Sequence, residues 1–441
     1  MSSFQGFILV LAFLQLAFQL VLKKKNETRI KLLKKVPPEE AQSIMDEDSW
    51  KKTSDYSLEK SRFSNLEEIW GFITFIPIFL FVFPWVFGTW NTSTEVGVWK
   101  SAFVVCCFFI SLQVLSFPLD WYKQFVVEEK YGFNKSSLKL WISDKLKGLV
   151  LGFAIGILLL SFLLYLFREV SSFLPQMWWV LSFCIFFLIQ LMLMVLWPKI
   201  FLPLFNKLTP LDEGSLKDRL ISLADRSGFK AKTIEIIDGS KRSGHSNAFF
   251  TGFGKFRRIV LYDTLVEQME EEEIEAVLAH EVGHYVKGHI PKRLFISFLS
   301  GLGMFGVISL ALNSPWIYES ANLPEYLLGS ASSILVLLSL TLGFLTYWVS
   351  PVSNFLSRKH EFEADLFAKE SIGSEKPLIE ALRKLYKENL THPLPHPWIA
   401  NFHFSHPTII ERERALRILR EAYKQLGYDE YAEKISNFEA N

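Results

Sequence analysis

About seven apolar runs, each long enough to cross a lipid bilayer as a helix, constrain the fold of this chain more than any other feature. A membrane-spanning helix needs roughly 20 consecutive, mostly apolar residues. The composition agrees, because 50% of the residues are hydrophobic and the chain contains 41 Phe and 13 Trp, which is unusual for a simple soluble enzyme. The sequence therefore predicts an α-helical multi-pass membrane protein, with spans at residues 4–22, 70–90, 101–119, 148–167, 177–197, 294–312 and 326–349.

The charged residues around these runs predict their orientation. Lys23, Lys24 and Lys25 follow the first run, whereas a signal peptide carries its positive charge before the apolar core, so we interpret this run as a retained span. The loops rich in Lys and Arg all fall on one predicted side of the membrane, which is expected to be the cytosolic side.

Net charge and cysteine content narrow the classes of partner. The formal net charge of +1 argues against nucleic acid or another acidic polymer as a partner. Cys106, Cys107 and Cys184 lie in apolar runs, without the spacing of a metal site or of a disulfide framework. We therefore expect the lipid bilayer rather than nucleic acid as a contact of this chain, and we expect the cysteines to be packing residues.

The apolar runs divide the chain into four parts. Residues 1–203 hold the first five spans and their cytosolic connectors, and residues 292–356 hold the last two spans. Between them, residues 204–291 are expected to form a soluble insert, and residues 357–441 form the C-terminal part. Residues 26–69 are polar and charged without a strong period, so no element is predicted there.

The soluble insert has the pattern of a small α+β domain. Residues 216–227 are amphipathic with the period of a helix, and residues 232–237 and 257–262 are typical of strands. Residues 238–254 are rich in Gly and Ser and predict turns around a short extended piece.

Residues 280–284, HEVGH, carry the spacing H-E-x-x-H. On a helix, His280 and His284 lie on one face, one turn apart, and so two imidazoles can bind one metal ion. Glu281 then lies beside the ion, where it can take a proton from a water molecule. A helix is favoured here, because acidic helix formers at 270–275 lead into an apolar stretch. Two histidines that merely pack or face solvent are the alternative until a third ligand is found.

A segment two spans later, SRKHEFEADLFAK at 357–369, offers that third ligand. Two crossings return the chain to its starting side, so this segment is expected to lie near the two histidines. Glu361 and Asp365 are one helical turn apart on one face, which suits a carboxylate ligand and an acceptor for the outer N–H of a ligand histidine. Glu363 is the alternative third ligand; it points off that face, as does His360, and solvent or packing is the favoured interpretation of both.

Two histidines and one carboxylate leave one coordination position for water, which is the pattern of a catalytic rather than a structural zinc site. The prediction is one Zn²⁺ per chain, which lowers the pKa of that water and polarises a peptide carbonyl. Glu281 is predicted to act as the general base. Together these features predict a membrane zinc endopeptidase.

An ordered set of motifs resembles one known family, the CAAX prenyl proteases of type I, which are integral-membrane zinc metalloproteases. The resemblance covers roughly residues 120 to 420, and the set in this order is far more specific than H-E-x-x-H alone. The motifs are FVVEEKYGFNK (125–135), PLFNKLTPL (203–211), DGSKRSGHSNAFFTGFG (238–254), RIVLYDTL (258–265), AHEVGH (279–284), SRKHEFEAD (357–365) and FSHPTIIERERAL (404–416).

The resemblance implies a fold and a metal centre. The implied fold is a ring of seven helices around an intramembrane chamber, with a small metalloprotease domain of gluzincin type and the zinc site on the cytosolic side. Family members remove the last three residues of C-terminal C-a-a-X sequences whose cysteine is prenylated. The implied roles are zinc binding for His280, His284 and Glu361, proton transfer for Glu281, and orientation of a ligand histidine for Asp365.

The resemblance also implies contacts with the substrate. Asn247 and Ala248 would lie on an edge strand that pairs with the extended substrate. His406 would stabilise the oxyanion, and Arg412 would contact substrate or a carboxylate. Other interpretations stay open: a turn residue for Asn247, a helix start for His406, and a solvated helix face for Arg412.

The other histidines have simpler interpretations, and two functions compete with a prenyl protease. His245, His289 and His403 are interpreted as structural or solvent-facing, and His392 and His396, which lie among prolines, are interpreted as loop residues. A quality-control protease that does not need prenylation would use the same chemistry on other membrane proteins. A transporter or receptor with an incidental metal pattern belongs to a different class, and it leaves the Glu361 and Asp365 pair unexplained.

Overall fold

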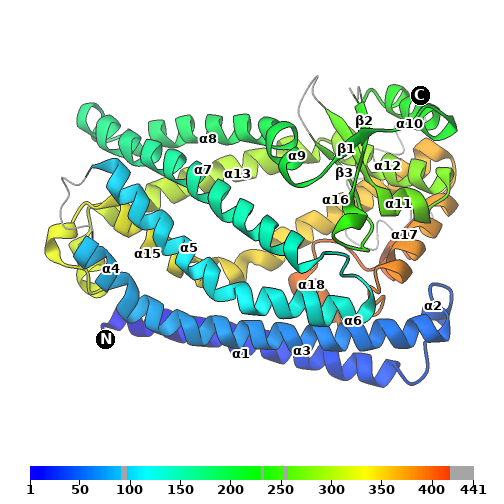
Figure 1. The fold of residues 1–441 in the computed structure, drawn as a ribbon, viewed down its shortest axis with the longest axis horizontal. Helices are drawn as coiled ribbons and strands as arrows, with labels where there is room; N and C mark the ends of the chain where they lie inside the picture. Colours follow the sequence, from blue (N-terminus) through cyan, green and yellow to red (C-terminus); the bar gives the residue numbers. More distant parts are fainter. Residues whose placement is uncertain (91–96, 230–232, 252–256, 418–441) are drawn as a thin grey trace.

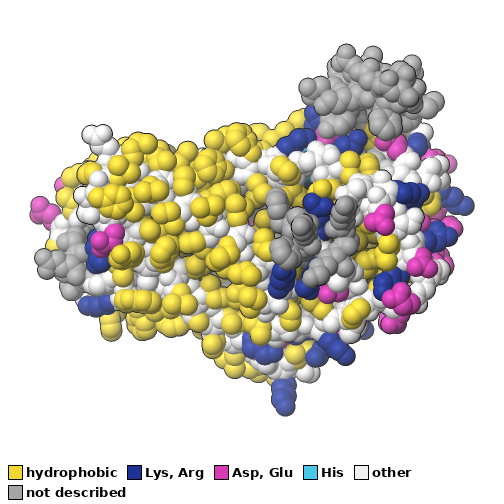
Figure 2. All heavy atoms as spheres, turned by 90° about the horizontal axis from the view of Figure 1, so that it is seen from above, with side chains coloured by type: hydrophobic (Ala, Val, Ile, Leu, Met, Phe, Trp, Pro, Cys, Tyr) yellow, Lys and Arg dark blue, Asp and Glu magenta, His cyan; other side chains and the backbone are white. Residues whose placement is uncertain are grey.

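Seven helical segments of the described residues are long and apolar enough to cross a membrane, which confirms the predicted multi-pass α-helical class. The computed structural model describes residues 1–90, 97–229, 233–251 and 257–417. In Figure 1 the long helices extend from one end of the molecule, and the sheet lies at the other end. Hydrophobic side chains cover the helical end in Figure 2, whereas charged side chains gather around the sheet.

Four of the seven segments are composite, because helices of different winding follow each other without a break. In chain order the segments are α1 (Ser3–Leu33); α3 (Glu47–Pro77) with η1 (Ile78–Val82) and α4 (Phe83–Trp90); α5 (Val98–Tyr122) with η2 (Lys123–Glu128) and α6 (Glu129–Tyr131); α7 (Leu138–Phe173); α8 (Trp178–Leu196) with η3 (Trp197–Phe201) and α9 (Leu202–Phe205); α13 (His289–Leu312); and α15 (Ala331–Thr346) with η7 (Tyr347–Val349) and α16 (Ser350–Ile372).

Helices α1 and α3 continue well beyond the apolar runs, so leaving residues 26–69 without an element was wrong for most of that stretch. Asp46 caps the start of α3 by accepting a backbone N–H three residues later at 2.8 Å. The two helices lie side by side (Figure 1), and Glu27 of α1 accepts hydrogen bonds from Ser61 and Asn65 of α3. Polar groups that pair between two helices leave no simple apolar stripe, which hides the helical period in the sequence.

The last span begins later than predicted and does not end in a loop. The predicted start at residue 326 falls in a short 3-10 turn, Glu325–Leu327, and α15 begins only at Ala331 after a left-handed Gly329 with φ of 84°. From there the helix continues through η7 into α16, which carries Glu361. The metal-site segment is therefore a continuous helical extension of the last span.

The soluble insert contains a four-stranded sheet in the order β1-β2-β4-β3. β2 and β4 are parallel, and the two outer strands are antiparallel to their neighbours. The predicted strands contain β2 and β4, the extended piece contains β3, and β1 is a three-residue strand that ends in proline and was missed. The strands are β1 (Leu208–Pro210), β2 (Thr233–Ile237), β3 (Ala248–Thr251) and β4 (Arg258–Tyr262).

Shorter helices surround the sheet and the ends of the spans, and the described residues form two large hydrophobic cores. One core joins Phe residues of the membrane helices, and the other lies between the sheet and α12, with residues such as Leu220, Ile259 and Leu278. The remaining helices are α2 (Glu39–Gln42), α10 (Ser215–Arg226), α11 (Asp263–Gln268), α12 (Glu271–Val286), α14 (Pro315–Ser320), α17 (Lys376–Glu388), α18 (Pro397–His403) and α19 (Ile409–Arg417).

Candidate metal centre

Helix α12 carries the H-E-x-x-H residues and packs closely against α16. Glu270 and Glu273 form a capping box that starts α12, with the Glu270 N–H donating to the Glu273 carboxylate at 2.8 Å. Gly283 faces the α16 backbone so closely that a Cβ atom there would lie 3.0 Å from Cα of Ala364. The lack of a side chain at Gly283 thus lets two helix backbones approach where the ligand side chains meet.

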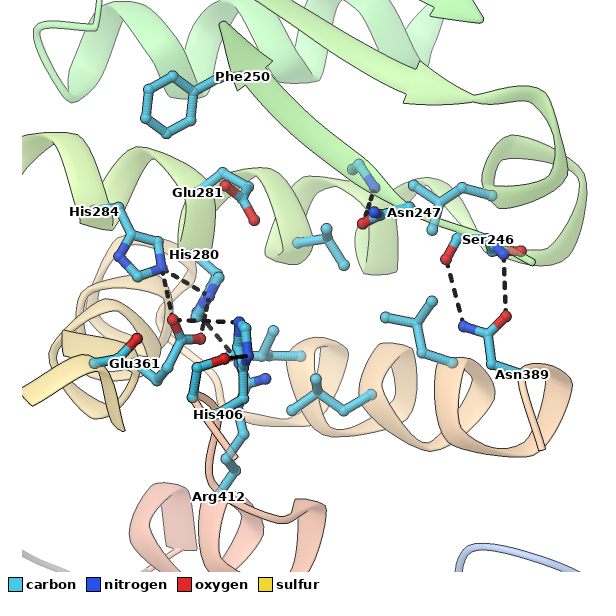
Figure 3. A pocket seen from close by; sticks show the side chains of 18 of the residues that line it. Ser246, Asn247, Phe250, His280, Glu281, His284, Glu361, Asn389, His406 and Arg412 are labelled. Atoms are coloured by element: carbon cyan, nitrogen blue, oxygen red, sulfur yellow. Dashed lines mark hydrogen bonds and ion pairs between the residues drawn. The ribbon is translucent and has the colours of Figure 1, made fainter. Parts of the chain in front are cut away.

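The structure brings together His280, His284 and Glu361, as the sequence predicts (Figure 3). Nε2 of His280 lies 3.3 Å from Oε2 of Glu361, and Nε2 of His284 lies 3.4 Å from Oε1. The two Nε2 atoms are 3.2 Å apart. One ligand atom from each residue lies within 4.8 Å of the others, so a single ion can reach all three.

The chemistry of this cluster fits a metal ion. Oε2 of Glu361 is buried and, although His280 is near, it accepts no hydrogen bond from the part of the chain that the structure describes, whereas a buried carboxylate oxygen is normally paired. Two imidazole nitrogens and a carboxylate are the donor set of catalytic zinc sites, and a cation among them would satisfy that oxygen.

His280 is supported from behind by Asp365 and Arg412. Nδ1 of His280 lies 2.8 Å from Oδ1 of Asp365, and Nε of Arg412 donates to Oδ2 of Asp365 at 2.8 Å. Burial lowers the pKa of His280, but the Asp365 and Glu361 carboxylates outweigh it and raise this pKa to about 9. His280 must then release a proton when it binds a metal ion.

Arg412 is buried, so the solvated helix face that we considered for it was wrong. Burial lowers the pKa of its guanidinium, but the Asp365 carboxylate more than compensates and the net shift is upward. Of the two predicted partners, substrate or a carboxylate, the structure shows the carboxylate. The spacing of arginines along α19 could not reveal this pairing, because Asp365 lies on another helix.

Glu363, the alternative third ligand, lies away from the cluster of His280, His284 and Glu361. Its Oε2 is 2.6 Å from Nε2 of His289, and the side chain is buried rather than solvated. His289 is buried as well, and its Nδ1 lies 2.9 Å from Nδ1 of His284. Burial, together with the neighbouring His280, lowers the pKa of His284 to about 3, so His284 is neutral at neutral pH and offers a lone pair to a metal ion.

Glu281 and His406 face the same cavity from opposite sides (Figure 3). Burial raises the pKa of the Glu281 carboxyl above its ordinary value, which makes its carboxylate a stronger base toward a water molecule. Nε2 of His406 lies 3.5 Å from Oε1 of Glu361, and Nδ1 of His406 lies 3.0 Å from the Ser405 hydroxyl. Partial removal from water in the cavity lowers the pKa of His406, although 64% of its side chain stays exposed, and its neutral imidazole can donate one N–H.

The cavity has a volume of about 670 Å³, and one of its walls is the edge strand β3. The Asn247 carbonyl accepts the Tyr262 N–H of β4 at 3.1 Å. Since the peptide bond is planar and trans, the N–H of Ala248 must point the other way, toward the free edge of the sheet. There it donates to the Asn247 side chain at 2.8 Å, so the strand keeps a donor that an extended ligand could use.

Sequence reasoning missed Asn389, which holds the start of this edge strand. Its Oδ1 accepts the Ser246 N–H at 3.1 Å, and its Nδ2 donates to the Ser246 carbonyl at 3.4 Å. The same Oδ1 lies 3.1 Å from Nδ1 of His245, which gives that histidine a structural contact. No sequence pattern marks Asn389, because it lies at the end of α17, which is remote in the chain.

Comparisons with known proteins agree with this geometry. The family profile described as CAAX prenyl protease N-terminal, five membrane helices, matches residues 28–207, and that of peptidase family M48 matches residues 210–420. CAAX prenyl protease 1 of Saccharomyces cerevisiae is 36% identical over 416 residues, which cover 88% of this chain and 90% of the yeast protein. The chain belongs to the CAAX prenyl protease type I family. The resemblance seen in the sequence is thereby confirmed.

Other members of the CAAX prenyl protease type I family extend the match over nearly the whole chain. The homolog from Oryza sativa subsp. japonica is 33% identical over 390 residues, which cover 86% of this chain and 89% of the rice protein. The crystal structure of S. mikatae Ste24p superposes with a TM-score of 0.83 at 32% identity, covering 94% of this chain and 99% of the solved one. The protein is therefore an integral-membrane metallopeptidase, and an incidental metal pattern in a transporter or receptor is excluded.

Proposed function

We propose that this chain is a zinc-dependent endopeptidase that removes the last three residues from prenylated CAAX-type proteins. The observation that carries the proposal is the cluster of His280, His284 and Glu361 beside the free edge of β3, within one cavity. The names of the relatives support the substrate class, since the yeast and rice proteins are CAAX prenyl proteases.

The metal ion supplies two kinds of chemistry when it is bound: it polarises the scissile carbonyl, and it acidifies a water molecule. We assign zinc because imidazole and carboxylate donors with one open position are typical of catalytic zinc. His280, His284 and Glu361 would hold it, and Asp365 and Arg412 would fix the orientation of the His280 ring.

The other cavity residues have separate roles in the proposed hydrolysis. Glu281 takes the proton of the attacking water, and it can pass that proton to the leaving amine. His406 donates its N–H toward the oxygen that becomes negatively charged. Ala248 and Asn247 bind the substrate as an added strand, in which a substrate carbonyl takes over the Ala248 N–H from the Asn247 side chain.

The membrane location follows from the spans and the charges around them. α16 carries Glu361 as the extension of the last span, so the site lies at a membrane face rather than in a separate domain. We propose that this is the cytosolic face, because the positively charged loops gather there. The membrane would be that of the endoplasmic reticulum in a eukaryote and the plasma membrane in a bacterium.

The decisive experiment compares a farnesylated CAAX peptide with its unprenylated twin, using the purified full-length protein with its metal content measured. Glu281→Gln serves as the inactive control. Faster cleavage of the farnesylated peptide after the cysteine is the expected result. Equal rates for both peptides would instead favour a quality-control protease, and a fully active protein without zinc would refute the metal centre.

A further inference from the structure

The second ligand histidine, His284, has a built support that no role assigned above explains. Behind His280 stands a carboxylate, Asp365, at direct hydrogen-bonding distance. Behind His284 stands His289, and behind His289 stands Glu363, with distances of 2.9 and 2.6 Å along the row. Both outer residues are almost fully buried, at 1% and 4% relative exposure, so solvent cannot replace these contacts.

The chain is shaped to put His289 in this place. Helix α12 ends near His284, and Gly288 then adopts a left-handed conformation with φ of 67°. This conformation favours glycine, and it lets α13 begin at once, with His289 as its first residue. Glu363 reaches the same point from α16, two residues after the ligand Glu361.

The positions of the protons along this row follow from the metal site. Nε2 of His284 faces the cluster and must present a lone pair, so neutral His284 carries its proton on Nδ1. That N–H donates to Nδ1 of His289, at 2.9 Å. His289 therefore carries its own proton on Nε2 and donates it to the Glu363 carboxylate at 2.6 Å. With the protons in these positions, each ring nitrogen of His284 and His289 either takes part in a hydrogen bond or directs a lone pair at the metal site.

We propose that His289 and Glu363 are positioning residues that orient His284 for metal binding, through a relay in which a histidine stands between the ligand and its carboxylate. The proposal rests on the metal centre proposed above. Carboxylates behind ligand histidines fix the ring and the tautomer, and their loss typically weakens metal binding by roughly 10–100-fold. His280 and His284 would thus have equivalent supports of different length.

A second metal ion is the competing explanation, because His289, Glu363 and His360 could together offer three ligand atoms. The rings of His289 and His360 are stacked, with centroids 4.0 Å apart and planes 15° from parallel. An imidazole binds a metal ion in the plane of its ring, so two stacked rings do not direct their lone pairs at one point. The relay also uses both nitrogens of His289.

The test measures metal affinity rather than activity alone, on the full-length protein in detergent. The variants are Glu363→Gln, which keeps the shape of the side chain; His289→Ala; and His289→Asn, whose oxygen can replace the Nδ1 acceptor. His360→Phe is the matched control, since it keeps the ring stack but removes both ring nitrogens. The measurements are the Zn²⁺ dissociation constant by chelator competition, the metal stoichiometry, and the visible spectrum of the Co²⁺ form.

Glu363→Gln and His289→Ala are expected to weaken Zn²⁺ binding by roughly 10–100-fold and to alter the Co²⁺ spectrum. His289→Asn should regain part of the loss, and His360→Phe should bind one Zn²⁺ with unchanged affinity. Unchanged affinity in Glu363→Gln, which is the variant least disturbing to the fold, would overturn the relay. A stoichiometry of two that falls to one in His360→Phe would also overturn it, in favour of a second metal site.

These outcomes separate the relay from the proposed function. If the unaltered protein cleaves the farnesylated peptide and binds one Zn²⁺, the function stands, and the variant affinities alone decide the relay. If the unaltered protein binds no Zn²⁺, both proposals fail together.

Discussion

Two close helix contacts, one in the catalytic half and one in the membrane half, are built in opposite ways. Between α12 and α16, Gly283 lies against the backbone of Ala364 and the Cβ atom of Phe367. Between α8 and α13, Gly301 lies against the ring of Phe183, which also packs against Phe298 and Phe305. The catalytic contact therefore joins two backbones, whereas the membrane contact joins a backbone to an aromatic side chain.

This difference shows where the molecule needs accuracy. A metal site needs its ligands held within a fraction of an ångström, and helix backbones in contact have little freedom to shift. A contact between membrane helices needs only complementary shapes, because small residues let neighbouring groups pack closely and an aromatic ring can rotate to fit. The same substitution made at each contact should therefore have different effects. At the α12–α16 contact it should weaken metal binding, whereas at the α8–α13 contact it should lower only the stability of the fold.

The largest effect is expected from Glu281→Gln. It keeps the size of the side chain but removes the base, so peptide cleavage should fall by roughly 10²–10⁴-fold. Zinc content should stay at one per chain, since Glu281 is not a ligand. Steady-state kinetics together with metal analysis checks this, and near-normal turnover in the variant would remove Glu281 from the mechanism.

Glu361→Ala is expected to reduce Zn²⁺ affinity by more than the roughly 10–100-fold that loss of a supporting residue costs. The reason is that it removes a ligand and leaves two histidines, His280 and His284, without the anion that balances the cation. Chelator competition measures the change. Should the affinity remain as before, Glu363 would have to be the third ligand after all.

A matched pair, Gly283→Ala and Gly301→Ala, tests the comparison directly. A Cβ at Gly283 would come within 3.0 Å of the α16 backbone, so the ligand helices must separate. Overpacking costs typically about 1–3 kcal/mol, and here we expect part of that cost to appear as weaker Zn²⁺ binding.

In Gly301→Ala the Phe183 ring can rotate away, and only the thermal unfolding temperature in detergent should fall. Equal losses of Zn²⁺ affinity in the Gly283→Ala and Gly301→Ala variants would show that the membrane contact also sets the ligand geometry.

The smallest effect concerns pH. Burial raises the pKa of Glu281 above its ordinary value of 4.5, and the base must be ionised to accept a proton. Activity is therefore full above the raised pKa and falls as the pH drops through it, so the acidic limb should lie above pH 4.5. A profile of kcat/KM at saturating Zn²⁺ measures the limb; a rate that stays constant down to pH 4.5 would contradict the assignment.

The class of the molecule and the three candidate ligands of its metal centre could be predicted from the amino-acid sequence alone. A continuous apolar run in a bilayer must pair its own backbone N–H and C=O groups, which a helix does, so the spans can be recognised without a structure. His280 and His284 are four residues apart, as are Glu361 and Asp365, and on a helix that local spacing already decides which side chains share a face. Such signals are short-range in the chain, and for that reason they can be read from it.

The residues that support these ligands could be identified only from the folded structure. Arg412 reaches Asp365 across 47 positions of the chain, and Glu363 reaches His289 across 74. No period or motif marks such pairs, because their contacts depend on how the helices pack and not on spacing along one of them. Burial then gives these contacts their importance, since a buried polar group that lacks its partner cannot turn to water instead.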